Sequence, residues 1–280
     1  MEKLGPAWSW GAGTSRSGSL AALEVLKSVS ADAILGGSTG RGVKVAIIDS
    51  GIDNGHPAVA GAVRGWVEPV VDDEGAVTYD DAPHGDLFGH GTACAGVVHG
   101  IAPEAELYSV RVLGTGLTGR ALMFAAGLRW AIDNDMHVVN LSLGTTSRDH
   151  FQLFHELVDE AYYRSTVLVT AANNMPVLSA PSLYAAVVSV ACHEEARVED
   201  PLDFYCNPSP PVEFGASGID VRLAWLSGGY ITGTGNSFAA PRLTGVVALL
   251  RGKHPHLTPF EVKTLLRALA RNVRPPPAPD

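Results

Sequence analysis

The chain has 280 residues, of which 46% are hydrophobic and 18% charged, and its formal net charge at pH 7 is −9. This balance excludes a largely disordered chain, because disorder needs few hydrophobic residues and a high charge. No cluster of Lys and Arg stands out, which disfavours nucleic-acid binding and a polybasic membrane anchor. No apolar run approaches the roughly 18 residues that a transmembrane helix needs.

The first 40 residues are interpreted as an N-terminal arm. Residues 1–17 are rich in Gly, Ser and Trp, and the apolar positions over 20–29 predict a short amphipathic helix. The arm has no apolar segment of the kind found in a secretory signal. The three cysteines are sparse and lack CxxC spacing, which argues against a disulfide framework or a zinc site. Together these features predict a cytoplasmic protein.

Continuous apolar runs predict the strands of one parallel sheet, which is typically apolar on both faces when helices cover it. The runs lie at 43–48, 107–112, 137–141, 166–171 and 187–191. Helical patterns at about 118–134 and 149–163 alternate with them. The sequence therefore predicts a doubly wound α/β domain over residues 41–272, with a mostly parallel central sheet and helices on both faces.

The C-terminal third adds a locally antiparallel region and two helices. Short β-like pieces and Pro-rich turns occupy 202–234, and a long helix is expected over about 237–251. The last helix is predicted from a capping box, in which Thr258 precedes Pro259 and Glu261. Residues 273–280 are interpreted as a Pro-rich tail.

Three segments carry residues suited to acyl-transfer chemistry. Asp49 closes the first apolar strand, and open α/β sheets bind ligands at the carboxyl ends of their strands. His90 lies between two glycines. Ser237 opens an apolar helix, where backbone N–H groups and the helix dipole stabilise an oxyanion. A serine hydroxyl becomes a nucleophile when a base takes its proton and an acid orients that base.

Each of the three residues also has a purely structural interpretation. Asp49 suits a turn, His90 suits a buried structural histidine, and Ser237 suits a helix N-cap. Together, however, the chain order Asp, His, Ser and the motifs IIDSGID, GHGT and GNSFAAP resemble the subtilisin-like serine proteases over residues 40–272. The resemblance implies a serine endopeptidase whose catalytic residues are Asp49, His90 and Ser237.

Two further stretches match working parts of that family. Ser142, Leu143 and Gly144 resemble the strand edge that pairs with substrate backbone and forms one wall of the S1 pocket. The stretch TAANN resembles the family's AAGN. The resemblance implies that the Asn174 side chain donates to the oxyanion, together with the Ser237 N–H.

The same register places Ser179 near the base of S1 and Met175 near its rim, and Ala172 completes the expected substrate-binding set. No acidic residue lies beside Ser179 or Met175, which argues against selection of Arg or Lys at P1. We therefore expect a medium apolar or aromatic side chain there. The chain departs from the family pattern at two positions. Asn236 stands where the family has Thr, and Asn173 stands where it has Gly.

No cofactor and no metal are expected, since the acidic residues at 72–74 and 80–81 fit a solvated loop better than a calcium site. About 40 residues precede the first core strand, too few for the signal and inhibitory pro-domain of secreted members. The resemblance therefore implies a stand-alone intracellular subtilase that acts on a peptide or protein substrate. Narrow processing specificity or a regulatory protein partner is expected to restrain it.

Two alternatives stay open at this point. A catalytically impaired member would use the strand edge as a peptide-binding module. A macrocyclase or transamidase would pass the acyl-enzyme to an amine, which usually requires an inserted helical lid, and no insertion of that size lies between the motifs.

Overall fold

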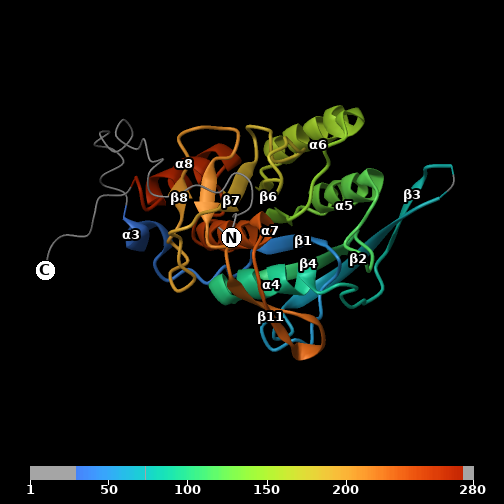
Figure 1. Cartoon of the computed structure of the whole chain (residues 1–280), viewed down its shortest axis with the longest axis horizontal. Coiled ribbons are helices and arrows are strands. Elements are labelled where there is room, and N and C mark those ends of the chain that lie inside the picture. The colour runs from blue at the N-terminus through green and yellow to red at the C-terminus, as the bar shows by residue number, and fades with distance from the viewer. Residues whose placement is uncertain (1–29, 73, 274–280) are drawn as a thin grey trace, which may run out of the picture.

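The computed structural model describes residues 30–72 and 74–273. Within them the core is a nine-stranded sheet with helices on both faces (Figure 1), so the predicted doubly wound α/β fold is confirmed. The helix predicted over 20–29 lies outside the described residues, as does the tail from residue 274. None of the helices in the described part is long and apolar enough to cross a membrane.

Seven parallel strands form the centre of the sheet, and one antiparallel strand flanks each edge. In order across the sheet the strands are β3 (Val77–Asp80), β2 (Val63–Val71), β4 (Glu106–Arg111), β1 (Lys44–Asp49), β5 (Val138–Leu141), β6 (Val167–Ala171), β7 (Val188–Cys192), β9 (Phe214–Ala216) and β8 (Tyr205–Cys206). The predicted parallel strands are all present, with no bound displaced by more than one residue.

Alternating side chains of β1 enter two separate cores, one on each face of the sheet. Val45 and Ile47 pack with the helices α4 (His90–Ile101), α7 (Asn236–Lys253) and α8 (Pro259–Leu269) and the short α3 (Ala31–Leu35). Ala46 and Ile48 pack with α5 (Ala121–Asp133) and α6 (Phe151–Tyr163). Figure 1 shows α5 and α6 on one side of β1 and β4, and α4 on the other.

The predicted C-terminal features are present, except that β9 lies in the region expected to be antiparallel and pairs in parallel with β7. An antiparallel hairpin joins β10 (Val221–Ala224) to β11 (Tyr230–Gly233), and α8 begins with the expected capping box at Thr258. Two short 3-10 helices complete the described elements, Arg148–His150 and Leu226–Gly228.

The hairpin of β2 and β3 was not predicted from the sequence. Its strands alternate buried and exposed residues or lie fully exposed, so they lack the continuous apolar run that revealed the central strands. Between its strands the Asp72 carboxylate accepts the N–H groups of Glu74 and Ala76.

Helices α4 and α7 pack closely, and this contact brings two motif residues together, because α4 begins at His90 and α7 carries Ser237 in its first turn. Gly245 of α7 makes the approach possible. A Cβ atom at this position would lie 2.7 Å from the Cβ of Ile101 on α4.

We predict that Gly245→Ala lowers the free energy of unfolding. An added methyl in a well-packed contact costs about 1–3 kcal/mol, which exceeds the gain of roughly 1 kcal/mol or less in helix propensity. Gly100→Ala is the matched control, because Gly100 is an exposed α4 residue whose Cβ would meet nothing within 4 Å. Urea unfolding followed by circular dichroism measures both, and a Gly245→Ala variant as stable as Gly100→Ala would contradict the packing argument.

Candidate active site

Asp49 lies at the carboxyl end of β1, in the middle of the sheet, and is fully buried. Its Oδ1 accepts the backbone N–H of Ser50 at 2.8 Å. A buried carboxylate is costly unless it is hydrogen-bonded and paired with a charge or a strong donor. The fold supplies that partner from the neighbouring helix α4.

The two glycines around His90 allow α4 to start beside Asp49. Gly89 has a φ of 109°, and a Cβ there would lie 2.6 Å from the Trp225 ring. A Cβ at Gly91 would lie 2.0 Å from the carbonyl oxygen of Gly51, in the loop after β1. Any larger residue would push the histidine away from the strand end.

Asp86 holds the turn that leads into α4. Its Oδ1 accepts hydrogen bonds from the Ser50 hydroxyl and the N–H groups of Phe88 and Gly89. Its Oδ2 accepts the N–H and the hydroxyl of Thr92. One carboxylate therefore ties the strand end, the turn and the first turn of the helix together.

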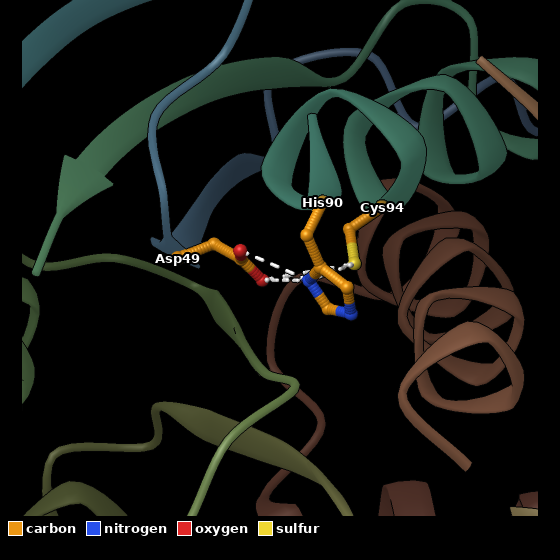
Figure 2. Close-up of side chains that lie close together, drawn as sticks. All are labelled: Asp49, His90 and Cys94. Carbon is orange, nitrogen blue, oxygen red and sulfur yellow. Dashed lines mark hydrogen bonds and ion pairs between the residues drawn. The ribbon is translucent and has the colours of Figure 1, made fainter. Parts of the chain in front are cut away.

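A continuous chain of hydrogen bonds links the three motif residues. The Nδ1 atom of His90 lies 2.9 Å and 2.8 Å from Oδ1 and Oδ2 of Asp49, as Figure 2 shows. The Nε2 atom lies 2.9 Å from the Ser237 hydroxyl oxygen. Because an ionised carboxylate can only accept, the proton sits on Nδ1 and Nε2 is left to accept the serine proton.

The charge of Asp49 decides the protonation of His90. Burial lowers the pKa of the imidazole, but the Asp49 carboxylate opposes this effect, with a smaller contribution from Cys94. The net result raises the pKa of His90 well above its usual value of 6.5. The neutral imidazole, which can accept a proton, therefore accumulates as the pH rises through this elevated pKa.

A buried polar network holds the backbone of Ser237 in place. The Ser142 hydroxyl donates to the Ser237 carbonyl at 3.0 Å and accepts from the Asn140 side chain at 2.9 Å. The Thr244 hydroxyl donates to Asn140 at 2.9 Å. Asn140 and Thr244 were not singled out from the sequence, because nothing in the motif pattern distinguishes them from ordinary strand and helix residues.

The side chain of Asn174 is anchored through its amide oxygen. Its Oδ1 accepts the backbone N–H of Asn236 at 2.9 Å, so the N–H groups of its amide lie on the free end of the side chain. The buried Asn236 amide donates to the carbonyls of Ala172 and Asn173 and accepts the N–H of Cys192. The asparagine that replaces Thr thus ties the start of α7 to the loop after β6.

A sequence model of the subtilase family matches residues 40–279. The chain belongs to the subtilase family.

Individual relatives agree with the assignment. The chain is 33% identical over 245 residues to the minor extracellular protease Epr of Bacillus subtilis (strain 168), covering 82% of this chain and 35% of Epr. It is 31% identical over 248 residues to subtilisin Savinase of Lederbergia lenta, covering 85% of this chain and 86% of Savinase. The chain therefore spans about a third of the length of Epr.

A solved structure described as a cold-adapted subtilisin-like serine proteinase superposes with a TM-score of 0.64. It is 25% identical, and the match covers 83% of each chain. The family match and these relatives support a serine-type endopeptidase. They do not test the cytoplasmic location, which stays a prediction.

The expected substrate-binding residues of this subtilase divide into two groups. Ser142, Leu143 and Gly144 line a cavity of about 390 Å³ that His90 also lines. Ala172 and Ser179 are buried, with 5% and 3% of their surface exposed, and neither lines that cavity.

Cys94 lies next to Asp49 and His90. Its Sγ is 3.8 Å from Oδ2 of Asp49 and 3.9 Å from Nδ1 of His90 (Figure 2), and ligand atoms of these three residues all lie within 4.8 Å of one another. Burial raises the pKa of the Cys94 thiol, which disfavours the thiolate that binds metals. A cation here would also have to replace the Nδ1 proton, so the geometry fits a triad better than a metal centre.

We predict that the His90 imidazole titrates above pH 6.5 and that Asp49→Asn lowers its midpoint. Removal of the carboxylate leaves burial as the dominant effect on its pKa. Nuclear magnetic resonance of ¹⁵N-labelled histidines measures the titration. His84 and His137 serve as internal controls, because burial lowers the pKa of both. A His90 midpoint at or below 6.5 in the wild type would contradict the assignment.

Proposed function

We propose that this subtilase is a serine endopeptidase that cleaves peptide bonds through an acyl-enzyme on Ser237. The observation that carries the proposal is the unbroken hydrogen-bond chain from Asp49 through His90 to the Ser237 hydroxyl. Nucleophile, base and orienting acid all lie within hydrogen-bond distance of their partners, which is the arrangement that activates a serine.

The reaction follows from this arrangement. The Ser237 oxygen attacks the scissile carbonyl carbon while Nε2 of His90 takes its proton. His90 then gives this proton to the leaving amine as the C–N bond breaks. Water attacks the acyl-enzyme with His90 again as base, which releases the carboxylic acid and restores the serine hydroxyl. Asp49 holds the imidazole in the required tautomer and stabilises the imidazolium.

The oxyanion of the tetrahedral intermediate needs donors that are already in position. We assign this role to the side-chain amide of Asn174 and the backbone N–H of Ser237. Support comes from the bond between Asn174 Oδ1 and the Asn236 N–H, which turns the donor end of the amide away from its anchor. The Ser237 N–H belongs to the first turn of the 18-residue helix α7, whose dipole favours negative charge at that end.

Substrate backbone is expected to pair with the edge formed by residues 142–144. The loop after Asn174 carries exposed apolar side chains, with Met175 64% and Leu178 54% exposed. These side chains agree with an apolar residue at P1. Narrow specificity, a regulatory protein partner and a cytoplasmic location are still predictions from the sequence.

The first test is labelling by a fluorophosphonate probe, which reacts with an activated serine. We expect stoichiometric labelling of the wild type and none of Ser237→Ala, because only this hydroxyl is bonded to His90. No labelling of folded wild-type protein would favour the peptide-binding module instead. The mass of the products of a linear peptide separates hydrolysis from ring closure, since hydrolysis adds one water and cyclisation adds none.

A second test concerns the oxyanion donor. Asn174→Ala should lower kcat for a peptide substrate by about 10²–10³-fold with little change in KM, the usual cost of losing one such donor. Asn173→Ala is the matched control, because the Asn173 side chain accepts only the N–H of Met175 within the described residues. Equal losses in both variants would show that the loop is merely distorted.

A further inference from the structure

The cavity beside His90 has two walls that come from distant parts of the chain. One wall is residues 142–145, at the carboxyl end of β5 and just beyond it. The other wall is formed by residues 113 and 117–120 of the connection from β4 to α5, together with Ala121 and Phe124 of α5. Because residues 142–144 are also the proposed S1 wall, the cavity lies on the acyl side, where residues N-terminal to the scissile bond bind.

The floor of this cavity is apolar. Leu113 and Phe124 are 9% and 4% exposed and belong to the core between the sheet and helices α5 and α6. Leu143 packs against the same core. Such a floor accepts the methylene groups of a substrate side chain but offers no partner to a polar group in its middle.

The rim carries one charge. Arg120 is the only charged lining residue other than the ionisable His90, and no acidic residue lines the cavity. Its side chain is exposed and makes no hydrogen bond or ion pair with any residue that the structure describes. Arg129 of α5 differs, since it pairs with Glu160 of α6. A guanidinium without an internal partner is free to bind a carboxylate bidentately.

We propose that Arg120 makes this cavity selective for a carboxylate side chain on the N-terminal side of the scissile bond, with glutamate preferred. The proposal rests on the peptidase function proposed above and adds its substrate class. The two methylenes of glutamate lie against Leu113 and Phe124, and the carboxylate reaches the rim. Aspartate is too short to do both, and lysine places a positive charge against Arg120.

The test uses fluorogenic peptides of one sequence that differ only at the second to fourth residues before the scissile bond. These positions carry Glu, Gln, Leu or Lys in turn. At one of them we expect kcat/KM for Glu to exceed that for Gln about twofold to fivefold at low ionic strength, the upper range for an exposed ion pair. The preference should weaken in 0.5 M salt, because salt screens exposed charges.

Arg120→Glu should reverse the order, so that Lys is preferred to Glu, and Arg120→Gln should abolish the discrimination. Arg64→Glu is the matched control. It makes the same change in net charge at an exposed residue of β2 that does not line the cavity, and it should leave the preference intact. A Glu preference that survives Arg120→Glu, or that Arg64→Glu also reverses, would overturn the proposal.

Failure of this proposal is distinguishable from failure of the proposed function. A wild type that reacts with fluorophosphonate but does not discriminate Glu from Lys overturns the role of Arg120 only. Binding of the same peptides to the Ser237→Ala variant, followed by fluorescence anisotropy, reports the preference without turnover. If no peptide is cleaved, the Glu preference in binding and its reversal by Arg120→Glu would still support the proposal, and their absence would overturn it.

Discussion

The buried pair of Asp49 and His90 is the interaction on which the rest of the structure depends. A carboxylate with no solvent exposure at the end of a central strand is tolerable only with strong donors around it. His90 and the Ser50 N–H supply them. The glycines on either side of His90 serve the same pair, because they let α4 start close to β1. The close approach of the backbone in this region is thus explained by the need to bring one imidazole to one carboxylate.

The serine is delivered by a different route, through packing of whole helices rather than through a local turn. Helix α7 is buried along most of its length, and it lies against α4 and four strands of the sheet, β5, β6, β7 and β9. The network of Thr244, Asn140 and Ser142 then fixes the backbone at Ser237. Asn140 lies in strand β5 and Ser142 follows directly after its end. The proposed substrate-binding edge and Ser237 therefore share one support.

This shared support has a consequence for specificity. The edge at 142–144 follows directly after the central strand β5, whereas the opposite wall of the cavity includes the exposed connecting residues 118–120. Loops of this kind carry specificity on many folds, since they tolerate change without loss of the scaffold. Arg120 there pairs with no residue in the described part of the chain, and its charge opposes the net charge of −9. It therefore acts on substrate side chains at short range rather than by long-range attraction.

The sequence by itself determined the parallel sheet and singled out Asp49, His90 and Ser237, which the fold brings within hydrogen-bond distance of one another. Strands buried on both faces must be continuously apolar, and residues at strand ends and helix starts carry recognisable motifs. It missed the β2–β3 hairpin, whose exposed strands follow no such rule, and the polar residues beneath the serine, which look like any others in their elements. Only the tertiary structure decided that Asn236 ties the start of α7 to the loop after β6, that Ala172 and Ser179 are buried, and that Arg120 lines the cavity beside His90. These facts depend on contacts between residues far apart in the chain, and no local pattern records which side chains such contacts bring together.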